Sequence, residues 1–428
     1  MGLLIKGGRV VDPDSGTDES LDVLVSGGAI EAVAPRIPPA GHETIDASGL
    51  VVAPGFIDMH VHLREPGSEK KETIRTAARA AARGGFTTIC GMPNTNPVND
   101  TPAVTEFVLA EARRSAVVNV LPIAAVTLGL KGDTPSDWAA LVRAGAVAFS
   151  DDGRPVGNAD IMRQALESSR NLGALVIDHC EDPSLTRGGS MNEGPTSRRL
   201  GLRGMPAAAE EVMVVRDIRL AEAAGARVHI AHLSVRGAVR AVAEARERGV
   251  RVSAEATPHH LLLDESLLED RNANFKMNPP LRSAADVAAL VAALRDEVVD
   301  VIATDHAPHT EEEKALGFEE APFGIVGLET AVPVLLDRLV RPNTISLIRF
   351  IALLSLHPAR LLGLGRKGRI AVGADADLTL LDLDRRTVVD RTRFESLSRN
   401  TPFDRWALRG APAMTVVGGN VVYPFGRT

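Results

Sequence analysis

Eight short runs of β-branched and aliphatic residues alternate with helix-like segments between residues 55 and 340, and this alternation limits the possible folds most. Each run is separated from the next by one expected helix, or by a loop and a helix, which is typical of βα units around a parallel sheet. Eight such units predict an α/β fold, a TIM-type (β/α)8 barrel. The predicted strands are 56–63, 87–92, 118–124, 146–150, 174–179, 227–232, 251–256 and 299–304.

The two ends of the chain differ from this middle part. They contain short strand-like runs broken by Gly, Asp and Pro, such as "LLIKGGRVVD" and "TVVGGNVVY". A chain of 428 residues with 45% apolar residues can bury one large core and a smaller one. We therefore expect a small β-domain built from residues 1–52 plus 365–428, and a barrel domain of residues 53–364.

Composition excludes several classes of function. The formal charge of −7 comes without a Lys/Arg-rich run, so nucleic acid is not an expected partner. The sequence has neither a secretory leader pattern nor an apolar run of about 18 residues, so we expect no membrane association and a cytoplasmic location. Cys90 and Cys180 are the only cysteines, and we expect them to be reduced core residues.

The first predicted strand ends in "FIDMHVHLREPG", which places two histidines close together. His60 and His62 are two residues apart, so on an extended chain both imidazoles point to the same face and can chelate one ion. In a barrel of this kind the active site forms at the C-terminal ends of the strands. The pair therefore lies where a site is expected.

Four other predicted strands also end in His or Asp. They contribute Asp151 and Asp152 after the fourth strand, His179 at the fifth, His232 at the sixth and Asp305 at the eighth. One such residue alone is explained by a helix cap or a buried core histidine. Convergence of five strand ends instead favours a metal centre.

Neutral imidazoles and carboxylates are the ligands that zinc prefers. Two zinc ions that share a carboxylate and a hydroxide form a hydrolytic centre in which the bound water ionises near neutral pH. Four neutral His, two Asp and one hydroxide would leave this centre a net charge of about +1, which favours a developing oxyanion.

Seven motifs at these positions resemble the amidohydrolase superfamily and, within it, the dihydroorotases of the larger bacterial type. The resemblance covers essentially the whole chain, and the motifs occur in that family's order. They are "PGFIDMHVHLREPG", "MPNTNP" at 92–97, "FSDDG" at 149–153, "DHCED" at 178–182, "MNEGP" at 191–195, "NPPLR" at 278–282 and "ATDHAPH" at 303–309.

The resemblance implies a ligand set for two zinc ions. His60, His62 and Asp305 would bind the first ion, and His179 and His232 the second. Asp152 would bridge them; the family's spacing to the following histidine favours it over Asp151.

The resemblance also implies a substrate site and an activity. Arg64, Asn94 and His309 would hold the substrate carboxylate, with His62, Asn278 and the backbone of Phe323 and Gly324 also in contact with substrate. A guanidinium recognises a carboxylate through two parallel hydrogen bonds, which suits Arg64. The implied reaction is the reversible cyclisation of N-carbamoyl-L-aspartate to L-dihydroorotate in de novo pyrimidine biosynthesis, by a zinc-bound hydroxide with Asp305 as the catalytic acid and base.

Two other functions stay open. Another cyclic amidase, such as an allantoinase or a dihydropyrimidinase, would bridge its metals with a carbamylated lysine after the fourth strand, yet no lysine lies between Lys131 and Lys276. A non-catalytic scaffold for aspartate carbamoyltransferase would have lost metal ligands, yet every expected position is filled. An active chain can also bind aspartate carbamoyltransferase, and a homodimer is a further possibility.

Four other histidines are not expected to be ligands. His229 and His306 should face away from the site because neighbouring side chains alternate along a strand. His259 and His260, in "ATPHHL", are expected to pack or to support ligands.

Overall fold

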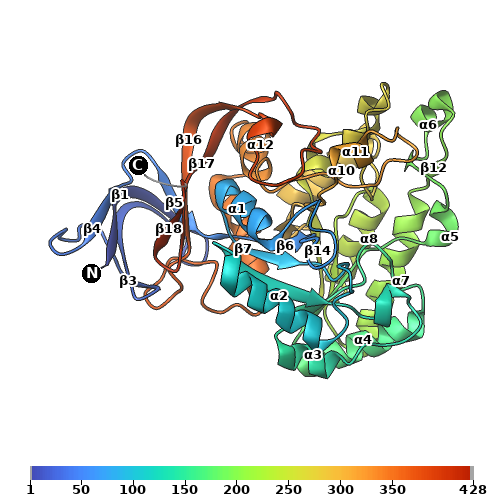
Figure 1. The fold of residues 1–428 in the computed structure, drawn as a ribbon, viewed down its shortest axis with the longest axis horizontal. Helices are drawn as coiled ribbons and strands as arrows, with labels where there is room; N and C mark the ends of the chain where they lie inside the picture. The colour runs from blue at the N-terminus through green and yellow to red at the C-terminus, as the bar shows by residue number, and fades with distance from the viewer. Residues whose placement is uncertain (1, 425–428) are drawn as a thin grey trace.

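A parallel eight-stranded barrel forms the larger part of the computed structural model, which describes residues 2–424 (Figure 1). Its strands are hydrogen-bonded in the order β15-β14-β13-β10-β9-β8-β7-β6. The barrel closes where Val61 bridges His306, and the His62 amide donates to the His306 carbonyl at 2.9 Å. The strands are β6 (Phe56–Val61), β7 (Phe86–Gly91), β8 (Asn119–Ala124), β9 (Ala148–Phe149), β10 (Leu175–Asp178), β13 (Val228–Ile230), β14 (Val252–Ala256) and β15 (Val301–Ile302).

All eight predicted strands are present, and the predicted barrel fold is confirmed. Seven of the eight paired segments are shorter than predicted, down to two residues in β9 and β15, and β7 keeps the predicted length of six. The chain leaves the regular pleat at the strand ends: His232 and Asp305 have positive φ angles of 29° and 48°. Because of this turn, His232 and Asp305 lie just after the last paired residues of their strands, whereas His60 lies within β6, directly before Val61.

Helices between consecutive strands cover the outside of the barrel (Figure 1). The first shows how the sequence sets their ends: the Thr73 side chain caps the amide of Thr76, and Gly85, with φ of 90°, ends the helix. The longer helices are α1 (Ile74–Gly84), α2 (Pro102–Ser115), α3 (Trp138–Ala144), α4 (Ala159–Leu172), α7 (Ala208–Ala224), α8 (Arg236–Glu247), α10 (Ala284–Arg295) and α13 (Leu347–Leu354).

Shorter elements connect these units. One insertion carries a two-stranded parallel pair, β11 (Met191–Asn192) and β12 (Gly204–Met205), at the end of the barrel far from the chain termini (Figure 1). The other short helices are α5 (Pro183–Thr186), α6 (Pro195–Leu200), α9 (Pro258–Leu262), α11 (Glu311–Lys314), α12 (Ala331–Leu335), α14 (Leu356–Leu361), η1 (Leu128–Leu130), η2 (Glu265–Leu268), η3 (Ala273–Phe275), η4 (Leu336–Val340) and η5 (Arg391–Arg393).

A second sheet joins both ends of the chain, as predicted. Its order is β18-β17-β16-β5-β1-β2-β3, with β4 also paired to β1. The boundaries 52/53 and 364/365 stay predictions, and Met1 and residues 425–428 lie outside the described residues. The strands are β1 (Leu3–Asp12), β2 (Thr17–Ser26), β3 (Ala29–Ala34), β4 (Glu43–Asp46), β5 (Val51–Pro54), β16 (Leu378–Val388), β17 (Ala407–Val417) and β18 (Asn420–Tyr423).

The start of β6 lies at the junction between the second sheet and the barrel. Phe56 is fully buried, and its ring meets the rings of Phe86 and Phe350 edge-on at centroid distances of 6.3 and 5.8 Å. Its amide donates to the Thr379 hydroxyl of β16. Because β6 leads directly to His60 and His62, this packing fixes the base of the strand that carries them.

Phe56→Ala is expected to lower the free energy of unfolding by about 3–5 kcal/mol, because it leaves a cavity among packed aromatic rings. Phe107 is 44% exposed, so Phe107→Ala is the matched control, with an expected change of about 1 kcal/mol or less. Denaturant unfolding of both variants measures the difference. Equal losses would contradict this account of the junction.

Candidate active site

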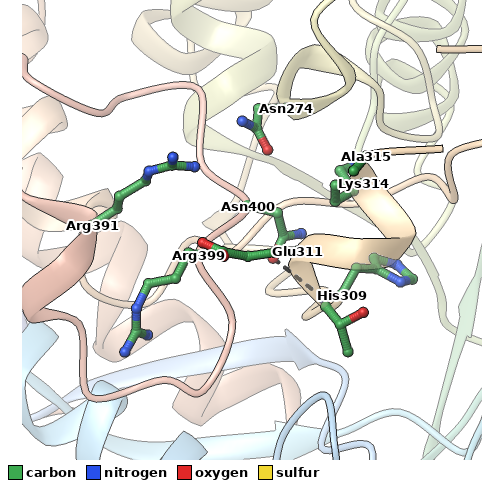
Figure 2. A pocket seen from close by; sticks show the side chains of 9 residues that line it. Asn274, His309, Glu311, Lys314, Ala315, Arg391, Arg399 and Asn400 are labelled. Carbon is green, nitrogen blue, oxygen red and sulfur yellow. Dashed lines mark hydrogen bonds between the residues drawn. The ribbon is translucent and has the colours of Figure 1, made fainter. Parts of the chain in front are cut away.

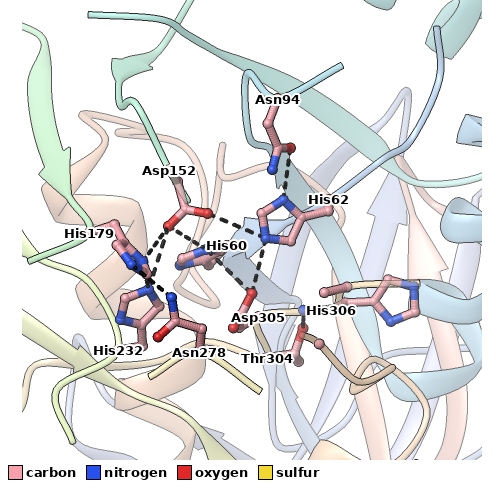
Figure 3. A network of polar contacts seen from close by, with 12 residues as sticks. His60, His62, Asn94, Asp152, His179, His232, Asn278, Thr304, Asp305 and His306 are labelled. Carbon is pink, nitrogen blue, oxygen red and sulfur yellow. Dashed lines mark hydrogen bonds and ion pairs between the residues drawn. The ribbon is translucent and has the colours of Figure 1, made fainter. Parts of the chain in front are cut away.

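Four histidines and two aspartates from five strand ends meet at one point of the barrel (Figure 3). All six residues are buried, and none has more than 6% of its surface exposed. The structure thus brings together every residue predicted as a metal ligand, namely His60, His62, Asp152, His179, His232 and Asp305.

The Asp152 carboxylate lies in the middle of the four imidazoles (Figure 3). One oxygen is 3.3 Å from His60 Nε2, 3.4 Å from His179 Nδ1 and 3.5 Å from His232 Nε2. The other is 3.4 Å from His62 Nε2. Asp305 lies on the side of the first strand, 3.1 Å from His62 Nε2 and 3.5 Å from His60 Nε2.

Asp151, the alternative carboxylate, points elsewhere. One of its oxygens accepts from the amides of Val126 and Thr127, and the other accepts from the Thr127 hydroxyl. Asp151 therefore anchors the loop after β8, and this geometry supports the choice of Asp152.

These separations suit metal coordination. Two ligand atoms on one tetrahedral zinc, each bonded at about 2.0–2.1 Å, lie about 3.3 Å apart, and the carboxylate-to-imidazole distances here are 3.1–3.5 Å. Within residues 2–424, His60 Nε2 and Asp152 Oδ1 are buried without any hydrogen-bond partner. In two groups of three residues, one ligand atom of each residue lies within 4.8 Å of the other two. These groups are His60, His62 and Asp305, and His60, Asp152 and His232.

The electrostatics also favour cations. Burial alone would raise the pKa of Asp152, but His60, His179 and His232 outweigh it and hold this pKa well below its usual range. Burial would lower the pKa of His179, yet the adjacent carboxylates of Asp152 and Glu181 raise it to about 10. An environment that stabilises protonated imidazoles to this extent also stabilises a bound cation.

Further polar groups orient three of the imidazoles. His60 Nδ1 donates to Glu255 at 2.7 Å, His62 Nδ1 to the Asn94 amide oxygen at 2.9 Å, and His179 Nε2 to Glu181 at 3.1 Å. Each contact leaves the second ring nitrogen facing the cluster, as metal-binding histidines require.

Glu255 and Glu181 have functional positions that sequence reasoning did not assign. Glu255 is fully buried and also accepts from His229 Nε2 and from the His232 amide, both at 3.2 Å. The sequence feature that could have identified Glu255 is a charged residue within a predicted buried strand, "VSAEA". Glu181 lies within the quoted "DHCED" motif, so proximity to His179 was its signal.

The four histidines not expected to be ligands all lie outside the cluster. His229 Nδ1 bonds to Ser253, His260 to Thr257 and the Pro279 carbonyl, and His306 to Glu72. His259 is fully buried, and both of its ring nitrogens lack a partner among the described residues.

A cavity of about 560 Å³ lies over the cluster and is lined by the residues predicted to bind substrate. Arg64 Nε donates to the Pro308 carbonyl at 3.1 Å, and burial lowers the Arg64 pKa to about 10, so the guanidinium stays charged at neutral pH. The set comprises His62, Arg64, Asn94, Asn278, His309, Phe323 and Gly324.

His309 and Asn278, from the same set, also have polar partners. His309 Nε2 donates to the Phe323 carbonyl at 2.8 Å, and burial together with Arg64 lowers the His309 pKa to about 2, so its ring is neutral. The Asn278 amide nitrogen donates to Glu181 at 2.6 Å, which leaves its oxygen as an acceptor.

Solved structures of a hydantoinase and a dihydropyrimidinase have the same architecture. L-hydantoinase from Arthrobacter aurescens superposes with a TM-score of 0.90 at 28% identity, over 98% of this chain and 95% of that one. Dihydropyrimidinase from Brevibacillus agri superposes with a TM-score of 0.84 at 27% identity, over 99% of this chain and 95% of that one. Fold and site together define the amidohydrolase superfamily.

Sequence comparison identifies the family within that class. A relative named dihydroorotase from Pelotomaculum thermopropionicum is 54% identical over 99% of this chain and 98% of its own length. Another dihydroorotase, from Geobacter metallireducens, is 48% identical over 99% of this chain and 100% of its own length. The family model described as "Dihydro-orotase-like" matches residues 49–238. The chain belongs to the dihydroorotase family.

Glu255→Gln is expected to weaken zinc binding by about 10–100-fold, because the charge that orients His60 is lost. Competition with a chelator measures the dissociation constant, and the exposed Glu247→Gln provides the control. Equal affinity in the wild type and both variants would show that Glu255 does not support a metal ligand.

Proposed function

We propose that this protein is a zinc-dependent dihydroorotase that interconverts N-carbamoyl-L-aspartate and L-dihydroorotate in de novo pyrimidine biosynthesis. The observation that carries the proposal is the buried cluster of four imidazoles and two carboxylates under a cavity lined by Arg64 and Asn94. Membership of the dihydroorotase family supports the choice of substrate.

The donor set fits two zinc ions. His60, His62 and Asp305 would hold one, His179 and His232 the other, and the central Asp152 would contact both. Bound zinc supplies Lewis acidity for a carbonyl and lowers the pKa of coordinated water.

Arg64 supplies the positive charge for the substrate carboxylate. Because its Nε is held by the Pro308 carbonyl, the terminal nitrogens of the guanidinium are left for a second partner. The Asn94 oxygen accepts from His62, so its amide N–H groups remain as donors beside Arg64. His309, with Nη2 of Arg64 3.3 Å from its Nε2, completes this side of the cavity.

Asp305 moves the proton. In the hydrolytic direction, water adds to the ring amide carbonyl, Asp305 takes a proton from the attacking water, and it returns that proton to the ring nitrogen as the C–N bond breaks. His60 and His62 keep the pKa of Asp305 well below its usual range, although burial opposes them. The carboxylate is thereby ionised before the reaction begins; ring closure runs through the same steps in reverse.

Two observations separate this function from its alternatives. The region after the fourth strand has no lysine to bridge metals as in other cyclic amidases, and Asp152 occupies the centre instead. A scaffold would not need six buried ligand residues in one cluster.

Assembly with aspartate carbamoyltransferase, a homodimer and a cytoplasmic location are further proposals. No helix within residues 2–424 is long and apolar enough to cross a bilayer.

A panel of cyclic amides tests the proposed substrate. The purified, zinc-loaded protein should hydrolyse dihydroorotate, followed by loss of ultraviolet absorbance, at least about 100-fold faster than dihydrouracil, hydantoin or allantoin. These three lack the carboxylate that Arg64 would bind, and a charged hydrogen-bonded partner left unpaired costs several kcal/mol. Faster turnover of any of the three would overturn the assignment.

Asp305→Asn is expected to lower kcat by at least about 10³-fold, because the amide cannot accept the proton. Zinc content is measured on the same preparation, since Asp305 is also a proposed ligand. Near wild-type turnover at full metal content would rule out the acid–base role.

Arg64→Lys is expected to raise the KM for dihydroorotate by about 10-fold or more with a smaller effect on kcat, because an ammonium lacks the planar fork. Arg75→Lys, at an exposed position on α1, is the control. An unchanged KM in Arg64→Lys would mean that Arg64 does not hold the carboxylate.

A further inference from the structure

The segment 319–324 forms one edge of the substrate cavity, and side chains from elsewhere bind its backbone carbonyls. Lys276 Nζ donates to the carbonyls of Glu319 and Ala321 at 2.8 and 2.7 Å. Lys314 Nζ donates to those of Pro322 and Gly324 at 2.9 and 3.0 Å. Two lysines therefore hold four of the six carbonyl oxygens of this segment.

Neither lysine is used in an ordinary ion pair. Within residues 2–424, no carboxylate lies within 4.0 Å of either ammonium, although Lys276 is only 3% exposed. Burial lowers the pKa of both lysines, and that of Lys314 falls to about 7. Burying an ammonium without a counter-charge costs free energy, so the bound carbonyls have to compensate for it.

The residues held by these lysines face the substrate. Phe323 and Gly324 line the cavity together with Arg64 and His309. The Gly324 amide donates to the Lys276 carbonyl at 2.9 Å, and Lys276 Nζ lies 4.5 Å from the centre of the Phe323 ring. Gly324 has φ of 128°, and a Cβ there would come within 2.7 Å of Ala307, so the segment has little room to shift.

Both lysines are also close in sequence to other residues of the site. Lys276 lies two residues before Asn278, and Lys314 ends α11, five residues after His309. Each lysine thus ties a segment that carries a substrate-facing residue to the 319–324 segment. His309 Nε2, which donates to the Phe323 carbonyl, completes the connection.

We propose that Lys276 and Lys314 are positioning residues: they fix Phe323 and Gly324 at the edge of the cavity and thereby set how tightly the cyclic substrate is held. The inference rests on the proposed function, since it assigns these lysines to the ring-binding side of the same cavity. Their ammonium groups contact backbone oxygens and need not touch the substrate.

Lys314→Met is the main test, because methionine keeps most of the stem and removes the donor. The Pro322 carbonyl then loses the lysine, and the Gly324 carbonyl keeps only the Asn400 amide. We expect the KM for dihydroorotate to rise about 10-fold or more, with a smaller change in kcat and unchanged zinc content. Lys276→Met should act in the same direction. Lys6→Met, at an exposed position on β1, is the matched control.

Chemical rescue separates positioning from general damage. Lys314, His309 and Asn400 line a second cavity of about 290 Å³, from which a reagent can reach position 314 (Figure 2). Lys314→Cys treated with 2-bromoethylamine regains an ammonium through a thioether, and its KM should return towards the wild-type value. Cys90 and Cys180 are buried, and the treated wild type controls for their reaction.

Limited proteolysis tests the lysines independently of turnover. Glu319 and Glu320 are exposed, so a glutamate-specific protease should cleave after them faster in Lys314→Met than in the wild type. Unchanged cleavage would overturn the inference, and so would faster cleavage with an unchanged KM. If Lys276→Met does not fold, Lys314→Met decides alone. A wild type that does not turn over dihydroorotate refutes the proposed function instead, and the cleavage rates still test whether Lys314 holds the segment.

Discussion

The structure depends on one buried arrangement, the Asp152 carboxylate surrounded by four imidazoles. Removing so many polar groups from water is favourable only if they are paired, and a bound cation is the partner that satisfies all of them together. Glu255, Asn94 and Glu181 then fix the rings from outside. The remaining architecture serves to bring five strand ends to this point.

Two kinds of support hold the two sides of the site. Strand ends carry the metal side, and the Phe56 packing fixes the base of β6 where the second sheet meets the barrel. Loops form the substrate side, and there single side chains donate hydrogen bonds to backbone carbonyls. Arg64 donates to the Pro308 carbonyl, His309 donates to the Phe323 carbonyl, and Lys314 donates to the Pro322 carbonyl. A loop with its carbonyls bound in this way can be as well ordered as a strand.

The sequence was sufficient to predict the barrel and the convergence of the cluster, because short apolar strands that alternate with helices, and the residues at their C-terminal ends, are local patterns. It was insufficient for Glu255, whose three partners come from two other strands, and for Lys276 and Lys314, which bind oxygens up to 45 residues away. The family spacing favoured Asp152 over Asp151, and the geometry supplies the physical reason: Asp151 binds the Val126 and Thr127 backbone, whereas Asp152 faces the imidazoles. Strand lengths were overestimated because residues such as His232, the last residue of the predicted strand 227–232, turn out of the pleat.

Anomalous diffraction at the zinc absorption edge, from crystals of the purified protein, tests the central claim most directly. The account predicts two peaks, both in contact with Asp152, one beside His60, His62 and Asp305 and the other beside His179 and His232. Absence of zinc from the cluster, or zinc only at the separate group of Asp178, Cys180 and Asp217, would contradict it.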